Sequence, residues 1–359
     1  MEKAWKRNFI DISPYTAGEQ PESEDIIKLN ANESPYPPSP EVLKRIKSFD
    51  AGSLRLYPSM DALNLRKAAA QRLSQLNNVS LSERNIFIGN GSDDVLATAF
   101  RAFFNSDKPI LFPSVTYSFY PVWCQLLKIP YKTTPMNEDF SINAADFYPE
   151  NGGVVIANPN APTAICQDLE FITDVLEHNS DCIVIVDEAY VDFGGCSAVS
   201  LTKSYKNLLV TQTFSKSRAM AGMRIGMAIG DSELTAILDA VKDSYNSYPL
   251  DSVAIETGIA SINDDAYFKQ TLERVISTRE RTAKRLHELG FSLTESKTNF
   301  LFVQHESKSA KEIFEYLRSN GVYVRYWDKP IISNRLRITI GTDEQMDIML
   351  NLLEKLLKA

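Results

Sequence analysis

Residues 207–230, NLLVTQTFSKSRAMAGMRIGMAIG, decide the fold because two apolar runs enclose one polar loop. The apolar runs predict two strands. Lys216 lies in the loop, and a lysine held near other cations loses proton affinity and becomes a usable nucleophile. The hydroxyl and guanidinium groups around it suit a phosphate. They belong to Ser215, Ser217, Arg218 and Arg224. A solvated basic loop is the plain alternative for this stretch.

Other short apolar runs predict strands at 85–89, 109–112, 153–157 and 182–187. Helical periodicity separates most of them, as in DDVLATAFRAFF, residues 93–104. Strands that are apolar on both faces and spaced by helices form a largely parallel sheet covered on both sides. The sequence therefore predicts an α/β protein whose large domain has a mostly parallel sheet sandwiched by helices.

The last third of the chain predicts a second, smaller α+β domain. A long amphipathic stretch at 265–290 ends at Gly290, a good helix stop. The patterns after it predict the order strand, helix, strand, strand, helix. We expect three parts, which are an N-terminal arm at 1–40 that packs on the small domain, a large domain at 41–249 and the small domain at 250–359.

Composition narrows the functional classes. The 359 residues carry a net charge of −8, which argues against nucleic-acid and membrane-surface partners. No apolar stretch is long enough for a signal peptide or a membrane helix. The four cysteines lack CxxC spacing, as is typical of reduced thiols in a cytoplasmic protein. The three histidines lie far apart, so we expect no metal site, and a bound cofactor is the expected source of chemistry.

Two further motifs carry polar groups at the ends of predicted strands. IFIGNGSDDV, residues 86–95, places a glycine turn before a helix start, where free N–H groups favour a phosphate. CIVIVDEAY, residues 182–190, ends an apolar strand in Asp187, whose carboxylate requires a cationic partner such as a protonated pyridine, a metal or an arginine. Ordinary helix caps are the alternative for both motifs. Two phosphate-type loops, a strand-end carboxylate and a lysine together match one molecule, pyridoxal 5′-phosphate (PLP).

With these motifs in order, the sequence resembles the fold-type I PLP-dependent aminotransferases, and most closely the histidinol-phosphate aminotransferases. The resemblance covers almost the whole chain. It rests on KLNANESPYPPSP, RLYPSMD, GNGSDDVL, FPSVTYSFYPVW, ANPNAPT, IVDEAYVDF, SKSRAMAGMRIG and LRITIG, which follow one another in the order of that family.

The resemblance implies the catalytic roles. Lys216 would form a Schiff base with PLP and, once released, move the proton as general acid and base. Asp187 would pair with the pyridinium nitrogen and keep it protonated. Tyr190 would hydrogen-bond the 3′ oxygen of the ring. Tyr117 would stack on the ring, although a core tyrosine on an amphipathic helix is its plain alternative.

The resemblance also implies how the phosphate of PLP is held. Ser92 and Asp93 would contribute backbone N–H groups, and Ser215 and Arg224 their side chains. Tyr57 would reach the cofactor phosphate of a neighbouring subunit, which implies a homodimer with shared active sites. A plain loop tyrosine is the alternative for Tyr57.

Four residues match positions at the substrate. Arg337 would take an acidic group, either the carboxylate of glutamate or the phosphate of histidinol phosphate, because a guanidinium suits both. Arg325 matches a second phosphate-binding arginine, with a surface arginine as the alternative. Tyr15 and Asn32 match positions that line the substrate pocket.

One loop departs from the family pattern NPNNPTG. Ala161 occupies the place of the asparagine that touches the 3′ oxygen, and Ala164 replaces the turn glycine. Asn160, one residue away, is the candidate for replacing the lost cofactor contact. Without it, the electronic tuning of the ring rests mainly on Tyr190.

The implied activity is ping-pong transamination between histidinol phosphate and 2-oxoglutarate in histidine biosynthesis. The alternatives with the same cofactor are an aromatic or broad-range aminotransferase and a PLP-dependent decarboxylase of amino-acid phosphates. A nucleotide-dependent oxidoreductase is disfavoured because no GxGxxG follows a strand. A ligand-sensing regulator would need a DNA-binding segment, for which we see no spare residues.

Overall fold

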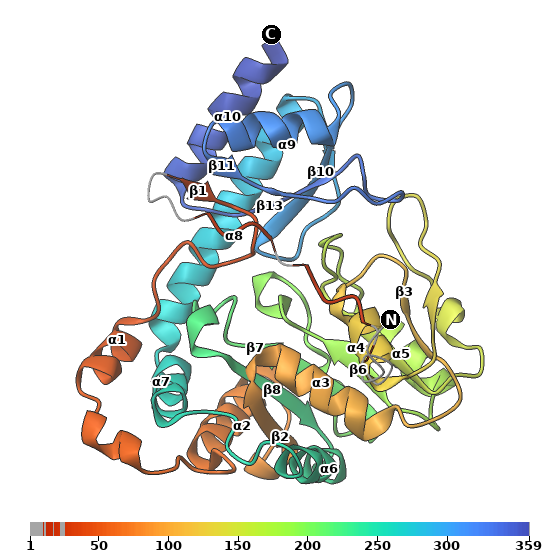
Figure 1. Ribbon diagram of the computed structural model, residues 1–359, viewed down its shortest axis with the longest axis vertical. Helices are drawn as coiled ribbons and strands as arrows, with labels where there is room; N and C mark the ends of the chain where they lie inside the picture. Colours follow the sequence, from red (N-terminus) through yellow and green to blue (C-terminus); the bar gives the residue numbers. More distant parts are fainter. Residues whose placement is uncertain (1–9, 11, 17, 22–25, 359) are drawn as a thin grey trace, which may run out of the picture.

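The computed structural model describes residues 10, 12–16, 18–21 and 26–358. The predicted N-terminal arm at 1–40 lies partly outside these described residues. Figure 1 shows a broad lower part built around a large sheet and a narrower upper part built around a small one, with the long helix α8 running between them.

The large sheet has seven strands, and only β8 runs antiparallel to its neighbours. The other neighbouring pairs are parallel. In sheet order the strands are β2 (Ile86–Asn90), β8 (Ile225–Gly230), β7 (Leu208–Thr213), β6 (Val184–Asp187), β5 (Gly153–Ala157), β3 (Ile110–Pro113) and β4 (Tyr131–Thr134). The six strands predicted from apolar runs are confirmed to within two residues.

Alternation along each strand divides the interior between two faces of the sheet. In β5, Val154 and Ile156 belong to one core cluster, whereas Val155 and Ala157 belong to the other. The first face is covered by α1 (Pro40–Lys47), α2 (Leu63–Asn77), α5 (Leu169–His178) and α7 (Ser252–Asn263). The opposite face is covered by α3 (Gly91–Phe103), α4 (Phe119–Leu127) and α6 (Ser232–Asp243). Because both faces are covered, the central strands are apolar over most of their length and carry polar residues only toward their carboxyl ends.

A second core lies in the upper part of Figure 1. Its sheet is antiparallel in the order β12 (Arg325–Tyr326), β13 (Leu336–Thr339), β10 (Phe300–His305) and β9 (Phe291–Leu293). The helices beside it are α8 (Asp265–Glu288), α9 (Ala310–Ser319) and α10 (Asp343–Lys358). A short parallel pair joins β1 (Ile27–Lys28) to β11 (Val322–Tyr323), so residues near the N-terminus lie against this C-terminal part.

The predicted boundary between 249 and 250 stays a prediction. Helix α7 contributes Ala254, Ile255 and Ile262 to a core of the large sheet, whereas α8 contributes Val275 and Leu286 to the core of the small sheet. Helix α8 ends just before Gly290, which has a φ of +83°. No helix in the described part of the chain is long and apolar enough to span a membrane.

Strand β8 passes very close to the first turn of α3. A methyl group on Gly226 would lie 2.4 Å from the carbonyl carbon of Gly91 and 2.4 Å from the backbone nitrogen of Ser92. These are backbone atoms, so they cannot yield unless the whole helix start shifts. Glycine at 226 therefore sets the distance between β8 and α3.

We expect Gly226→Ala to destabilise the protein by about 1–3 kcal/mol, the usual cost of overpacking a tight core. Gly222→Ala is the matched control, because a methyl group at 222 would meet nothing within 4 Å. Urea unfolding followed by circular dichroism measures both. Equal midpoints for the two variants would contradict the close approach of β8 to α3.

Candidate active site

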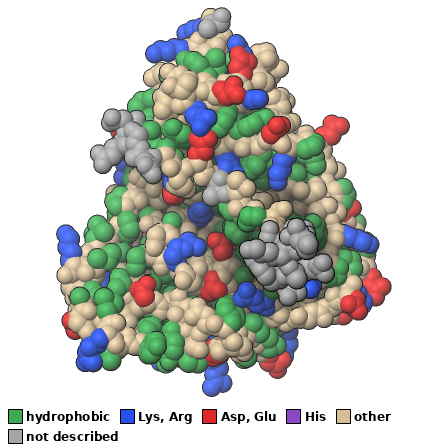
Figure 2. Space-filling view, viewed as in Figure 1, with side chains coloured by type: hydrophobic (Ala, Val, Ile, Leu, Met, Phe, Trp, Pro, Cys, Tyr) green, Lys and Arg blue, Asp and Glu red, His purple; other side chains and the backbone are tan. Residues whose placement is uncertain are grey.

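A cavity of about 620 Å³ lies beyond the carboxyl ends of the parallel strands of the large sheet. On the face drawn in Figure 2 the surface is hollowed between the upper and lower parts, and basic and acidic side chains lie side by side there. Most of the predicted site residues line the cavity. They are Tyr15, Asn32, Ser92, Asp93, Tyr117, Asp187, Tyr190, Ser215, Lys216, Arg224, Arg325 and Arg337. Tyr57 and Asn160 are not among its lining residues.

One end of the cavity can hold an anion. Helix α3 begins there at Gly91, and Arg224 packs over this glycine so closely that a methyl group would lie 2.4 Å from Nη2. Arg224 also lies 3.5 Å from the carboxylate of Asp93 through Nη2. Ser215 lines the same cavity from the end of β7. The helix N-terminus and the guanidinium together favour a phosphate.

In the loop that carries Lys216, the side chains of Ser217 and Arg218 do not line the cavity. This corrects the sequence-based interpretation that they belong to the phosphate site. Ser217 donates to Asp192, and Arg218 donates to the carbonyl of Ser261 at 2.8 Å. The Arg218 guanidinium also lies 4.5 Å from the ring centroid of Phe268, and burial lowers its pKa. These two side chains hold the loop against its surroundings and do not line the cavity.

Asp187 is buried at the last position of β6 and has only neutral partners. Tyr120 donates to Oδ2 at 2.8 Å, and Thr211 donates to Oδ1 at 3.2 Å. Burial raises the pKa of Asp187 to about 6, against the smaller opposing effect of these hydroxyls. No described lysine or arginine forms an ion pair with it. A carboxylate in this state is suited to a cation that enters the cavity.

Lys216 and Tyr190 form the part of the cavity nearest the small sheet. The ammonium of Lys216 lies 5.8 Å from the centroid of the Tyr190 ring, and it donates to the carbonyl of Ala31 at 3.3 Å. The hydroxyl of Tyr190 accepts a hydrogen bond from Asn32 Nδ2 at 2.8 Å. Among the described residues no carboxylate forms an ion pair with this amine, which lines the cavity, so a small aldehyde can reach it.

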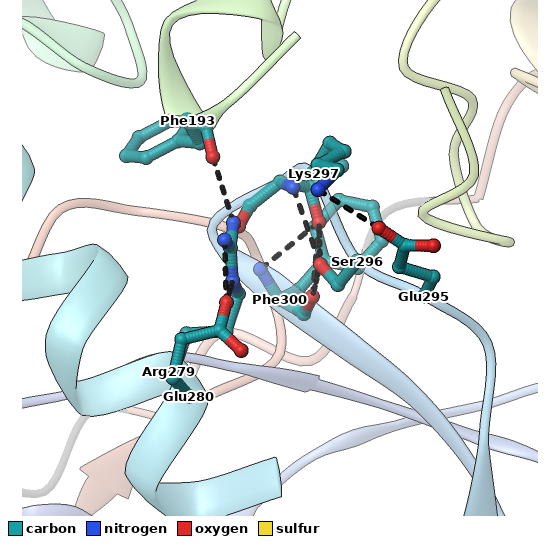
Figure 3. A network of polar contacts seen from close by, with 8 residues as sticks. Phe193, Arg279, Glu280, Glu295, Ser296, Lys297 and Phe300 are labelled. Atoms are coloured by element: carbon teal, nitrogen blue, oxygen red, sulfur yellow. Dashed lines mark hydrogen bonds and ion pairs between the residues drawn. The ribbon is translucent and has the colours of Figure 1, made fainter. Parts of the chain in front are cut away.

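The turn that carries Tyr190 is fixed to α8 and to the start of β10, as Figure 3 shows. Arg279 of α8 is buried and donates through Nη1 to the carbonyls of Phe193 and Thr298, each at 2.8 Å. The ring of Phe300 meets the Tyr190 ring edge-on, with centroids 5.1 Å apart. One buried guanidinium thus joins three segments that are distant in sequence and holds the turn after β6.

Tyr117 is held by an acid at the start of α3. Its hydroxyl donates to Asp93 Oδ1 at 2.7 Å, and burial followed by the Asp93 charge raises the pKa of Tyr117 far above its usual range. The Asp93 side chain therefore orients both Tyr117 and Arg224, in addition to the backbone role expected of it. Tyr15 lies near Tyr117, with ring centroids 6.4 Å apart.

A cationic region lies on the small-sheet side. Arg337 of β13 is half-buried, and its Nη2 donates to the backbone carbonyl of Asn30 at 2.8 Å. Its Nε has no hydrogen-bond acceptor among the described residues. Desolvation lowers the pKa of Arg337. The guanidinium groups of Arg325 and Arg337 lie 5.2 and 5.3 Å from the ring centroid of Trp327. This region is suited to an anionic ligand.

Asn160 does not supply the cofactor contact expected of it. Its Nδ2 donates to the carbonyl of Val115 and to Thr163 Oγ1, and its Oδ1 accepts from Thr116. The side-chain amide of Asn160 is thus used between its own loop and the loop that follows β3. Ala161 lines the cavity with a methyl group only, and Ala164 keeps the left-handed φ of +67° that favours a glycine.

Sequence reasoning missed Tyr120, Thr211 and Trp327. Tyr120 lies in the first turn of α4 and Tyr117 two residues before that helix, so closeness in sequence was the only available signal. Thr211 lies beside Asp187 in the register of β6 and β7, which only the sheet order reveals. Trp327 follows Arg325 by two residues, but the loop after β12 had no pattern that pointed to the cavity.

The chemistry of the lining fits one kind of cofactor. The anion-binding end, the buried carboxylate without a cation and the lysine amine match a phosphate, a protonated ring nitrogen and an aldehyde. Asp187 is the most specific of these three features. It is a buried acid without a counter-charge, and this burial raises its pKa. The residues present therefore fit PLP.

Comparisons with known proteins agree with this geometry. The family model described as aminotransferase class I and II matches residues 24–353. A histidinol-phosphate aminotransferase of Lactococcus lactis subsp. cremoris (strain MG1363) is 49% identical over 355 residues, covering 99% of this chain and 98% of that protein. One of Acinetobacter baumannii (strain SDF) is 49% identical over 344 residues, covering 95% and 94%.

Solved structures share the fold. A histidinol-phosphate aminotransferase of Sinorhizobium meliloti, in complex with pyridoxal-5′-phosphate, has a TM-score of 0.82 at 23% identity and covers 92% of this chain and 91% of its own. The enzyme of Clostridium acetobutylicum has a TM-score of 0.83 at 21% identity, with 93% and 99% covered. The fold class predicted from the sequence is confirmed. From the matching family model and the full-length relatives we conclude that the chain belongs to the class I and II aminotransferase family.

Proposed function

We propose that this aminotransferase uses PLP to exchange an amino group between glutamate and histidinol phosphate and their keto counterparts. One observation supports this substrate class above the others. The guanidinium of Arg337 lines the same cavity as Lys216, with an unused Nε and no carboxylate partner among the described residues. An anionic substrate would satisfy it, and the names of the relatives indicate which anion.

The residues assigned to the cofactor are those that the chemistry of the lining selects. Ser92, Asp93, Ser215 and Arg224 would hold its phosphate, and Asp187 would face its ring nitrogen. When bound, PLP supplies an electron-accepting ring that stabilises negative charge at the reacting carbon.

The chain itself would orient the reactants and move the proton. Lys216 Nζ lines the cavity beside Tyr190, and we assign to it the transfer of the proton from the α-carbon of the substrate. Asp187 remains ionised when a cation pairs with it, since that charge favours the carboxylate. Tyr190 would donate its hydroxyl hydrogen to the ring oxygen of the cofactor, and Tyr117 would cover the ring.

The proposed substrate contacts come from the small sheet and the N-terminal segment. Arg337 would bind the phosphate or carboxylate, and Arg325 the outer part of the same anion. Trp327 lies against both arginines and limits their orientation. Tyr15 stacks on Phe119 at 4.3 Å between ring centroids, which places an aromatic wall at the cavity.

We further propose a homodimer with shared active sites. Tyr57 is 82% exposed and stacks on Tyr248, with ring centroids 4.7 Å apart, well away from the lining of its own cavity. Apolar side chains around it are also exposed. They are Leu43, Ile46, Leu54, Leu56, Met60 and Leu63. An apolar surface of this kind supports an interface with a second copy that brings Tyr57 to the partner's cofactor phosphate.

We propose a cytoplasmic location because the cysteines form no disulfide bonds among the described residues. Cys124, Cys166, Cys182 and Cys196 are all free thiols. Free thiols are typical of proteins in a reducing compartment.

The substrate proposal predicts that Arg337→Gln impairs recognition of the anion. We expect kcat/KM with histidinol phosphate to fall about 100-fold or more, because removing one partner of a buried charge pair costs roughly 2–5 kcal/mol. Wild-type protein should prefer histidinol phosphate over histidinol, and the variant should lose this preference. Steady-state kinetics with glutamate or 2-oxoglutarate as the second substrate measures both.

Other outcomes would select an alternative. Equal wild-type turnover of phenylalanine and histidinol phosphate would indicate an aromatic or broad-range aminotransferase. Release of carbon dioxide from an amino-acid phosphate would indicate a decarboxylase. Wild-type protein that shows no visible band with PLP would contradict the proposal at its first step.

The raised pKa of Asp187 predicts a pH dependence of cofactor binding. In the cofactor-free protein the carboxyl is neutral below its pKa of about 6, and it must lose its proton before it pairs with the ring cation. The affinity for PLP should therefore fall as pH decreases below 6, by up to about tenfold per unit. Titration of PLP into cofactor-free protein between pH 5 and 8 measures this.

Asp187→Asn is the matched variant, because it keeps the shape and removes the titration. The variant should bind PLP more weakly at pH 8. Its affinity for PLP should no longer change with the ionisation of residue 187, whereas any change caused by ionisation of the cofactor phosphate should remain. Parallel curves for the two proteins across this pH range would show that Asp187 does not pair with the ring.

Shared active sites predict that two inactive variants restore activity when mixed. Lys216→Ala lacks the amine, and Tyr57→Ala lacks the side chain given to the partner. After unfolding and refolding together, about a quarter of all sites should contain both native residues, since half of the dimers are hybrids with one intact site. Activity of the mixture, compared with each variant alone, measures this. No gain in a mixture shown to be dimeric by sedimentation would place Tyr57 outside the partner's site.

A further inference from the structure

Asn32 approaches the cofactor end of the cavity from a segment far from it in sequence. The residue is 1% exposed, and its Nδ2 donates to the hydroxyl of Tyr190 at 2.8 Å. It adopts a left-handed backbone conformation with a φ of +54°, which asparagine tolerates better than most residues. The side chain is therefore directed at Tyr190 by a local turn of the chain.

Hydrogen bonds to β13 decide which end of the Asn32 amide faces Tyr190. The backbone N–H of Asn32 donates to Oγ1 of Thr339 at 3.0 Å, and this hydroxyl donates back to Asn32 Oδ1 at 3.1 Å. Because the carbonyl end is occupied by Thr339, the NH₂ end must face Tyr190. The backbone carbonyl of Asn32 accepts a hydrogen bond from Asn299 Nδ2 at 3.0 Å, which further fixes the segment.

This arrangement sets the direction of the Tyr190 hydroxyl. A phenol has a single hydrogen, and here its oxygen already accepts one from Asn32. No acceptor for the Tyr190 hydrogen lies among the described residues, so the hydrogen is available to a group in the cavity. A hydroxyl that accepts a hydrogen bond also becomes a stronger donor, because bonds in a chain polarise one another.

The side chain at 161 makes this donor more important. Ala161 offers only a methyl group to the cavity, and the amide of Asn160 is directed away from it. Tyr190 is therefore the remaining neutral donor in this part of the lining, and Asn32 is the side chain that orients it.

We propose that Asn32 is a positioning residue that holds the Tyr190 hydroxyl as a donor to the ring oxygen of PLP and so replaces the effect of the amide that Ala161 lacks. This inference rests on the cofactor role proposed for Tyr190.

The same segment also contacts the substrate arginine and the lysine. Arg337 Nη2 donates to the carbonyl of Asn30 at 2.8 Å, and Lys216 Nζ donates to that of Ala31 at 3.3 Å. Three consecutive residues thus touch Arg337, Lys216 and Tyr190. Thr339, which orients Asn32, lies two positions from Arg337 on β13. An anion bound at Arg337 therefore acts on the segment that orients the phenol.

The test is the pH at which the visible absorption of the bound cofactor changes. A donor to the ring oxygen stabilises its negative charge, so a weaker donor makes that oxygen more basic. In Asn32→Ala the transition should move to higher pH by up to about one unit, as expected for one neutral hydrogen bond. Charged groups near Tyr190, namely Lys216, Asp187 and Arg337, are unchanged in this variant.

Tyr190→Phe separates a positioning role from a general loosening of the fold. In the Tyr190→Phe background, Asn32→Ala should add no further shift, because its effect passes through the hydroxyl. Ser34→Ala is the control, since Ser34 belongs to the same segment but does not line the cavity, and its Oγ donates to the carbonyl of Tyr36 at 3.1 Å. In that variant the pH of the spectral transition should equal the wild-type value.

Each outcome decides the inference. A transition in Asn32→Ala that equals the wild-type value, or a shift of the same size in the Tyr190→Phe background, would overturn it. A wild-type protein without any visible band would instead overturn the proposed cofactor. Thermal unfolding of each variant with circular dichroism shows whether the fold is retained.

Discussion

The burial of the Asp187 carboxylate without a cationic partner is the constraint on which the rest of the site depends. Its position at the end of β6 is fixed by the sheet on both sides, and the side chains that donate to its carboxylate are the neutral hydroxyls of Tyr120 and Thr211. Such an acid is costly in an apolar interior unless a cation reaches it. The cavity in front of it supplies the space for that cation, so the sheet both creates the electrostatic requirement and leaves room for the ligand that satisfies it.

Around this acid, the two sheets contribute different chemistry. The large sheet carries the groups that suit the cofactor, at strand ends and at the start of α3. The small sheet carries the arginines that suit an anionic substrate. Residues 29–32 lie between them and contact Arg337, Lys216 and Tyr190 through Asn30, Ala31 and Asn32. Recognition of the substrate and orientation of the catalytic groups therefore share one stretch of backbone.

Local patterns explain what could be predicted. Lys216 and Asp187 follow apolar strands directly, so their place at a strand end follows from a few neighbouring residues. Strand β4 was missed because Tyr131, Lys132 and Thr133 are exposed at the edge of the sheet and form no apolar run. The direction of a side chain in a loop was also not predictable. Ser217 and Arg218 follow the lysine in sequence but bind Asp192 and Ser261, and Asn160 binds the loop after β3 at Val115.

The sequence by itself determined most of the buried strands, the α/β class, the resemblance to a family and the residues with reactive side chains, because each depends on residue type and short-range spacing. The tertiary structure alone decided that Asn32 meets Tyr190, that Tyr120 and Thr211 hold Asp187, and that Asn160 turns away from the cavity. These contacts join residues 67 and 158 positions apart, or depend on loop geometry, and no local pattern records them. The physical reason is that hydrogen-bond partners are set by where the packed sheets bring distant backbone segments together.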